Sequence, residues 1–188
     1  KNNGSTAGLT GAVRKVGRSS TGNRITVQGS SSNPVKCNMV IDDVYSRYQQ
    51  ASESRTTGGI TFLPESQNSY LDIELNGDNR FGAIHYVNSY ESTRLRIRGV
   101  GSLTVADVDF DKSRSPFSES KNAGKNIVGY SSNHWCSAIG ADDSRQEAVG
   151  IVIDGGDIYA GTTAAENCTA IGGGGNGYGV VTINGGSV

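Results

Sequence analysis

The chain has 188 residues, a formal net charge of −1, 35% hydrophobic residues and 19% charged residues. This length suits one domain with a substantial core and is short for two domains of ordinary size. The near-neutral charge offers no basic field for a phosphate backbone, which argues against nucleic acid as a partner. No apolar run is long enough to insert into a membrane.

The composition favours β-strands. Ile (13) and Val (16) together outnumber Leu (6) and Met (1), and Gly fills 27 positions. Branched aliphatic side chains are enriched in pleated strands, and glycine permits the backbone conformations of tight corners. We therefore expect an all-β protein.

In chain order, the first signals are short alternating segments. Residues 25–29, 71–77 and 95–99 each alternate apolar and polar side chains and end in Gly or Asn-Gly. Alternation at period two turns one face of a strand inward and the other outward. Each segment therefore predicts a half-buried strand that ends at a corner.

Long polar excursions separate these strands. Residues 43–55 carry Val44 and Tyr48 at helical spacing and predict a short helix, and residues 142–149 predict another after an aspartate cap. The stretch at about 106–135 is rich in Ser, Asn and Lys. We expect a long loop insertion there.

The strongest pattern is an internal repeat. Cys-Ser-Ala-Ile-Gly at 136–140 recurs as Cys-Thr-Ala-Ile-Gly at 168–172, and Ile-Asp-Gly-Gly-Asp-Ile at 153–158 recurs as Ile-Asn-Gly-Gly-Ser-Val at 183–188. Phe-Gly-Ala-Ile at 81–84 is a weaker echo of the first half. A period of about 30 residues with short strands and glycine corners is typical of a solenoid, whose coils bury their inward faces on one another. We predict a parallel β-helix, with a β-sandwich as the alternative.

The cysteines and the last strand extend this prediction. Cys37, Cys136 and Cys168 cannot all pair within one chain and show no CxxC spacing, so no disulfide framework or zinc site is indicated. Cys136 and Cys168 hold equivalent repeat positions, so we expect them to stack as buried free thiols. Residues 180–188 form a strand and turn without a terminating cap, which indicates a single β-helix segment, 1–188, of a longer protein.

Several phrases together resemble a known family. They are Ala-Ile-Gly-Gly-Gly at 170–174, Tyr-Gly at 178–179, Val-Thr-Ile-Asn-Gly-Gly at 181–186, and the strand-turn-strand phrase Leu-Arg-Ile-Arg-Gly-Val-Gly-Ser-Leu-Thr-Val at 95–105. With them the chain resembles the glycine-rich, right-handed parallel β-helix surface proteins of gut-dwelling Gram-positive bacteria. The resemblance covers roughly residues 70 to 188, and the insertion at 106–135 departs from the family pattern.

The resemblance implies a right-handed parallel β-helix and a secreted or cell-surface location in a bacterium. Many such proteins are called carbohydrate-binding by similarity to a calcium-containing β-helix that binds plant polysaccharide, and others are adhesins. Some gut commensals also display immunoglobulin-binding superantigens. The shared phrases describe core positions and corners, so they are specific for the fold and carry no site residues.

A possible metal site follows residue 106. Asp107, Asp109 and Asp111 alternate with Val108 and Phe110, so on an extended strand the three carboxylates share one face. Oxygen ligands at this density suit calcium. The other interpretation is a solvated outer face that discourages edge pairing, and we favour it. Calcium is the one cofactor that the sequence suggests.

The insertion and the excursion at 45–55 both place aromatic residues among hydrogen-bonding side chains. Exposed aromatic rings grip sugar faces and protein surfaces because they supply large rigid area at low entropy cost. Loops on one face of a solenoid are also its commonest binding site. An alternative for Trp135 is that it fills the core beneath the loop. The predicted ligand-binding residues are Phe117, Tyr130, His134 and Trp135 in the insertion, and Tyr45, Arg47, Tyr48 and Arg55 in the excursion.

The sequence predicts no catalytic residue. His85 and His134 are the two histidines, and no Gly-x-Ser-x-Gly elbow accompanies them. Asp154 holds the position that Asn184 fills one repeat later, which indicates a structural role. We expect a non-catalytic extracellular binding or adhesion module that recognises a glycan or host glycoprotein. The alternatives are an immunoglobulin-binding module, a polysaccharide lyase or hydrolase, and a passive stalk.

Overall fold

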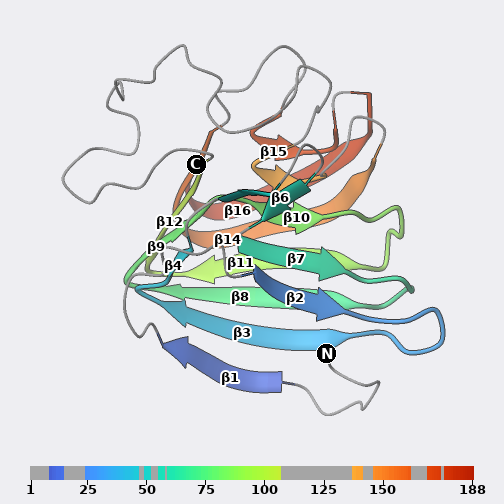
Figure 1. The fold of residues 1–188 in the computed structure, drawn as a ribbon, viewed down its shortest axis with the longest axis horizontal. Helices are drawn as coiled ribbons and strands as arrows, with labels where there is room; N and C mark the ends of the chain where they lie inside the picture. Colours follow the sequence, from blue (N-terminus) through green and yellow to red (C-terminus); the bar gives the residue numbers. More distant parts are fainter. Residues whose placement is uncertain are drawn as a thin grey trace.

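The computed structural model describes residues 9–14, 24–46, 49–51, 55–57, 59–106, 137–141, 146–161, 169–174 and 176–188. These residues form strands, turns and irregular segments and contain no helix (Figure 1), so the all-β prediction is confirmed. The strands are β1 (Leu9–Arg14), β2 (Arg24–Gln28), β3 (Lys36–Asp42), β4 (Tyr45–Ser46), β5 (Gln49–Ala51), β6 (Arg55–Thr57), β7 (Gly59–Leu63), β8 (Tyr70–Asn76), β9 (Asp78–Phe81), β10 (Ile84–Tyr86), β11 (Arg94–Gly99), β12 (Ser102–Ala106), β13 (Ile139–Gly140), β14 (Ala148–Gly161), β15 (Ile171–Gly172) and β16 (Gly179–Ser187).

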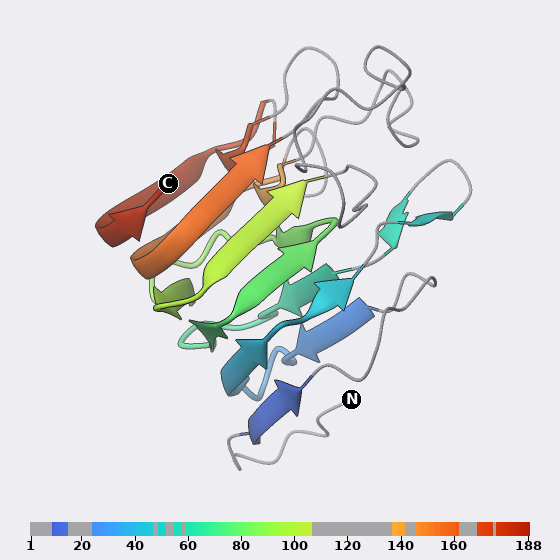
Figure 2. The ribbon, with the colours of Figure 1, turned by 90° about the vertical axis from the view of Figure 1, so that its left-hand side faces the viewer.

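The strands form two large sheets and one small hairpin. The nine-stranded sheet runs β1-β3-β8-β11-β14-β12-β9-β4, with β16 also paired to β14, and the five-stranded sheet runs β15-β13-β10-β7-β2. Among the described strands, every pairing in these two sheets is parallel. Figure 2 shows the nine-stranded sheet rising from β1 near the N-terminus to β16 near the C-terminus. Among the described strands, only β5 and β6 pair antiparallel, and an isolated antiparallel bridge joins Ser30 to Asn33.

The chain alternates between the two sheets. β2, β7, β10, β13 and β15 belong to the five-stranded sheet, and in each case the next strand along the chain belongs to the nine-stranded sheet. The register of the five-stranded sheet aligns one isoleucine from each strand, in the order Ile25, Ile60, Ile84, Ile139 and Ile171. The alternating strands therefore repeat the same inward position from one pass of the chain to the next.

The nine-stranded sheet stacks its inward residues in the same way. One row aligns Cys37, Leu71, Leu95, Ile151 and Val181. A second row, two positions further along each strand, consists of Met39, Ile73, Ile97, Ile153 and Ile183. The middle members of both rows are fully buried, so parallel stacking of equivalent apolar side chains builds the core.

The predicted internal repeat coincides with this stacking. Ile139 pairs with Ile171, and the hydroxyl groups of Ser137 and Thr169, 32 residues apart, lie 2.6 Å from each other. Ile153 pairs with Ile183 in the second half of the repeat. The weaker echo at 81–84 is also in register, because Ile84 pairs with Ile139. Residues 25–29 behave differently, since they lie in the five-stranded sheet rather than beside residues 71–77.

The predicted helix over 43–55 is wrong. This segment contains β4, β5 and the start of β6 instead. Parallel pairing of β4 with β9 and the β5–β6 hairpin give its backbone groups sheet partners, and those pairings override a helical spacing of only two or three apolar residues. In the second predicted helix, 142–149, the described residues 146–149 are also not helical, and β14 begins within them at Ala148.

A buried asparagine fixes the turn between β10 and β11. The Nδ2 atom of Asn88 lies 2.8 Å from the hydroxyl of Tyr86, 2.8 Å from the carbonyl of Val149 and 2.9 Å from that of Tyr90. The Tyr86 hydroxyl donates to the same Val149 carbonyl at 2.7 Å. These bonds satisfy polar groups inside the protein and hold the turn against β14, which adds a side-chain constraint to the strand stacking.

Candidate functional site

Most of the ligand-binding residues predicted from the sequence lie outside the described residues. Phe117, Tyr130, His134 and Trp135 belong to the insertion, and Arg47 and Tyr48 fall in the gap between β4 and β5. Tyr45 lies in β4 and Arg55 begins β6, where the backbone alone is described. The proposed calcium ligands Asp107, Asp109 and Asp111 and the stacked thiols Cys136 and Cys168 are also outside. These assignments remain predictions.

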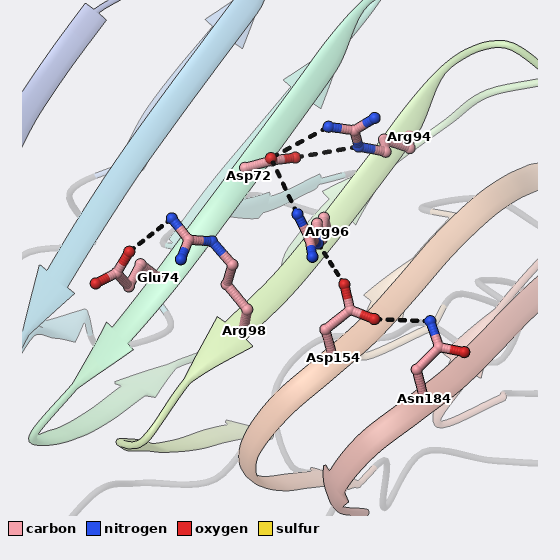
Figure 3. Close-up of polar contacts among 7 residues, drawn as sticks. All are labelled: Asp72, Glu74, Arg94, Arg96, Arg98, Asp154 and Asn184. Carbon is pink, nitrogen blue, oxygen red and sulfur yellow. Dashed lines mark hydrogen bonds and ion pairs between the residues drawn. The ribbon is translucent and has the colours of Figure 1, made fainter.

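The described residues with the densest polar chemistry lie on the outer side of the nine-stranded sheet. The alternating sequence of β11 turns Leu95 and Ile97 into the core and leaves three arginines on the opposite face. Parallel register then places Arg96 beside Asp72 of β8 and Arg98 beside Glu74. We call the following seven residues the arginine face: Asp72, Glu74, Arg94, Arg96, Arg98, Asp154 and Asn184 (Figure 3).

Asp72 is the most buried acid of the arginine face, with a side chain 9% exposed. Arg94 donates to it twice, from Nε to Oδ1 and from Nη2 to Oδ2, each at 3.2 Å. Arg96 approaches from the other side, with its Nη1 atom 3.9 Å from Oδ2. Two guanidinium groups therefore share the negative charge of one buried carboxylate, and the forked contact from Arg94 fixes its orientation.

Arg96 extends this network to two more strands, β14 and β16. Its Nε atom donates to the carboxylate of Asp154 on β14, and the Nδ2 atom of Asn184 on β16 donates to the other oxygen of Asp154 at 2.7 Å. Figure 3 shows these side chains in a continuous line from β8 to β16. Four neighbouring strands thus each supply one member, Asp72, Arg96, Asp154 and Asn184, to a single chain of polar contacts.

Two further contacts flank the line. Arg98 makes a separate ion pair with Glu74, with Nη2 to Oε2 at 2.6 Å. The guanidinium carbon of Arg94 lies 5.0 Å from the centre of the Tyr70 ring, within the range of a cation–π contact. Arg94 is therefore held by a carboxylate and by an aromatic ring, and part of its donor set still faces solvent.

The electrostatics of the arginine face are balanced. Three arginines face three carboxylates, so the formal charges cancel. The hydrogen bond from Asn184 and then the contact with Arg96 hold the pKa of Asp154 below its ordinary value, against a smaller opposing effect of burial. Asp154 therefore stays ionised at neutral pH, and the face presents fixed donors and acceptors without a strong net field.

A second polar group lies where β8 turns into β9. The backbone N–H of Asp78 donates to Asp43 at 2.9 Å, and Ser102 donates to the Asp78 carboxylate at 3.0 Å. Arg80 makes an ion pair with the same carboxylate at 2.8 Å. The first two contacts link neighbouring strands or their turns, and the ion pair lies within β9, so this group stabilises the corner.

The described residues hold no group of three or more His, Cys, Asp or Glu side chains that could bind a metal ion. Cys37 is a free, buried thiol in the core, and burial, followed by the nearby charge of Asp72, raises its pKa. His85 is buried on β10, between Ile84 and Tyr86, which are buried as well. In the part of the chain that the structure describes, no helix has the length and apolar character that crossing a membrane requires.

Sequence reasoning missed the arginine face. Arginines at alternate positions in the Leu-Arg-Ile-Arg-Gly run of β11 are the pattern that could have indicated it, because they predict a row of arginines on one face of the strand. Locating the acidic partners required knowing that Asp72 precedes this strand by 22 positions along the chain and that Asp154 follows Arg96 by 58. The long stretch of sequence between β12 and β13 makes the second separation unpredictable from a fixed period.

Comparison with known proteins adds no assignment. The chain matches no protein-family model, no curated protein and no solved structure. The arginine face must therefore be interpreted from its own chemistry. Planar guanidinium, carboxylate and amide groups held in one line can donate and accept hydrogen bonds to a ligand that lies across the strands.

Proposed function

We propose that the chain is a segment of right-handed parallel β-helix that acts as a non-catalytic binding module of a bacterial surface protein, with a glycan or host glycoprotein as its partner. Two observations support the fold. Strands one repeat apart pair in parallel and in register, as at Ile139 and Ile171, and strands of the two sheets alternate along the chain. A β-sandwich is normally built from antiparallel sheets, so the parallel pairing favours the β-helix.

The arginine face is the observation that carries the binding proposal. Its arginine side chains are already oriented by ion pairs, so a ligand would not have to order three flexible side chains on binding. Sugars offer many hydroxyl groups that both donate and accept hydrogen bonds. Alternating guanidinium, carboxylate and amide groups complement such a ligand, and balanced charge suits a neutral glycan better than a polyanion.

Aromatic residues of the insertion complete the proposal. Tyr130 and Trp135 would add stacking surfaces to the polar contacts of the arginine face. The insertion follows β12, a strand of the same sheet that carries the face. The three aspartates at its start provide the calcium alternative, in which metal and sugar would bind together.

The test is retention of a soluble glycan panel and of human serum glycoproteins on immobilised residues 1–188, with and without a calcium chelator. We expect retention of a glycan, weakened roughly tenfold by Arg96→Gln, which removes one oriented donor group. Arg80→Gln is the matched control, since it removes an ion pair of the same kind at a corner away from the face. Tyr130→Ala with Trp135→Ala tests the insertion separately.

Each alternative predicts a different outcome. Antibody retained after enzymatic removal of its glycans would indicate the immunoglobulin-binding module. Unsaturated or newly reducing sugar ends released from a polysaccharide would indicate an enzyme, and loss of glycan on chelation would support calcium at Asp107, Asp109 and Asp111. No retention in any arm would overturn the binding proposal and leave a passive stalk as the best explanation.

A further inference from the structure

A row of two cations and an aromatic ring crosses one end of the arginine face. The strand register aligns Lys36 of β3, Tyr70 of β8 and Arg94 of β11. Their chain neighbours point into the core, so these three side chains lie on the outer side of the sheet. Lys36 and Arg94 are exposed and Tyr70 is partly exposed. We call these three residues the cationic row. The next position, on β14, is Gly150, which adds no side chain beside Arg94.

Arg94 is held in one orientation and still has donors to spare. Its Nε and Nη2 atoms donate to Asp72, and its guanidinium carbon lies 5.0 Å from the centre of the Tyr70 ring. A guanidinium has five N–H donors, and the contact with Asp72 uses one side of it. Figure 3 shows the remaining nitrogen, Nη1, pointing away from Asp72. The fork formed by Nη1 and the second N–H of Nη2 therefore has no acceptor among the described residues.

Lys36 is the cation that the ion pairs of this face leave over. Three arginines cancel three carboxylates on the arginine face. The ammonium group of Lys36 has no ion-pair partner in the part of the chain that the structure describes. The acid on the same face of β3 is Asp42, six positions further on, which is about 20 Å along an extended strand. The cationic row therefore adds one positive charge to an otherwise balanced face.

We propose that the cationic row is a subsite for a sugar unit that carries one carboxylate and ends an otherwise neutral glycan. This inference rests on the proposed function and names the acidic end of its glycan. Arg94 donates two parallel hydrogen bonds to the carboxylate from Nη1 and Nη2, and Lys36 approaches it from the other side of Tyr70. The fork of a guanidinium matches the two oxygens of a carboxylate in one plane. Because Asp72 and Tyr70 already orient Arg94, this fork needs little ordering on binding.

The surroundings of the cationic row favour a single carboxylate. β3 and β11 flank β8, so the backbones of Lys36 and Arg94 are two strand spacings apart, about 10 Å. Two long side chains can close on one carboxylate across that span. Asp72 and Glu74 follow Tyr70 along β8 on the same face. A glycan with a carboxylate on every sugar would meet these acids and be repelled, whereas a neutral stem can lie over them.

The experiment compares two probes that differ only in the terminal acidic sugar. They are N-glycans released from serum glycoproteins, with their terminal sialic acid and after its enzymatic removal, each titrated onto immobilised residues 1–188. We expect the intact glycan to bind at least roughly tenfold more tightly. Lys36→Gln should abolish most of this difference without changing the affinity for the trimmed glycan, and Lys36→Arg should retain it. Lys36 is exposed, so both variants should fold, which a β-type circular dichroism spectrum would verify.

Arg80→Gln is the matched control, because it removes the same charge at a corner away from the cationic row. It should retain the full preference for the intact glycan. A loss as large as that of Lys36→Gln would show a long-range effect of net charge and overturn the subsite. Equal affinity of the unchanged chain for the two serum glycans would also overturn it, and would leave the proposed function standing.

Two further probes identify the acid. A neutral oligosaccharide capped with a uronic acid offers the same carboxylate and should bind more tightly than its uncapped form. The same oligosaccharide capped with a sulfated neutral sugar lacks a planar carboxylate and should gain less. An equal or larger gain from sulfate would overturn the assignment to a carboxylate. Failure of all these acidic probes to bind would overturn the subsite, and the glycan panel would then decide the proposed function independently.

Discussion

The Nε atom of Arg96 donates a hydrogen bond to the carboxylate of Asp154, although the two residues are 58 positions apart in the chain. The undescribed residues 107–136 lie between them in sequence, and β11 nevertheless pairs in register with β14. The contact therefore depends on the parallel pairing of β14 with β11. Variants of this pair report on the continuity of the sheet and on the arginine face together.

Replacing Arg96 with Met should lower the free energy of unfolding by about 1 kcal/mol. The variant keeps the aliphatic packing of the side chain and removes the contacts to Asp72 and Asp154. The buried carboxylate of Asp72 then keeps only its ion pair with Arg94. Arg98→Met loses one pair with Glu74 on a half-exposed part of the face. Its expected cost is below roughly 0.5 kcal/mol. Urea unfolding of both variants measures the two free-energy changes. Equal changes would contradict the inference that the contacts of Arg96 with Asp72 and Asp154 stabilise the fold more than the pair of Arg98 with Glu74.

Acidification should lower the free energy of unfolding, in part because Asp154 becomes protonated. Its pKa is lowered in the folded state, first by the hydrogen bond from Asn184 and then by Arg96. The stabilisation is therefore complete above the ordinary pKa of 3.8 and is lost as the pH falls through the lower folded-state value. Asp154→Asn removes this titration. Its urea midpoint should fall less steeply than that of the unchanged chain between neutral pH and pH values below 3.8.

The sequence was sufficient for the parts of the fold that depend on local alternation. Strand patterns at 71–77 and 95–99 correspond to β8 and β11. The first half of the repeat pairs in register, and in the second half Ile153 pairs with Ile183, with register shifts after it. Each of these predictions needed only the rule that alternate side chains share a face. The helix predicted over 43–55 failed because its residues find partners in other strands, and a local spacing pattern contains no information about distant pairing.

The arginine face needed information that the sequence lacks. The strand pattern of β11 placed its arginines outward, but their partners depend on which strands become neighbours. Asp72 and Asp154 come from opposite sides of β11, and the passes of the chain differ in length. A fixed period of about 30 residues describes only the last pass, in which Asp154 and Asn184 are 30 positions apart.

Matched substitutions in the isoleucine row should measure how much stability the next strand contributes. Ile153→Ala removes a fully buried side chain and should cost about 2–5 kcal/mol through lost burial and the cavity left behind. Ile183→Ala makes the same chemical change at a half-exposed position of residues 1–188 and should cost less than roughly 1.5 kcal/mol. Similar costs at the two positions would mean that the end of the core is covered.

A pair of glycines provides the sharpest test of strand stacking. Gly140 and Gly172 pair in register, with φ values of 135° and 131° that L-residues rarely adopt. A Cβ on Gly140 would lie 2.0 Å from the carbonyl oxygen of Gly172, whereas a Cβ on Gly172 meets nothing closer than 4.0 Å. Gly172→Ala should therefore cost about 1 kcal/mol or somewhat more from backbone strain alone. Gly140→Ala adds a clash with the backbone of the next strand and should cost several times as much, because β13 and β15 would have to separate. Thermal unfolding of the two variants, each checked for a β-type spectrum, decides the matter: an equal loss of stability would show that the close approach of these strands does not constrain position 140.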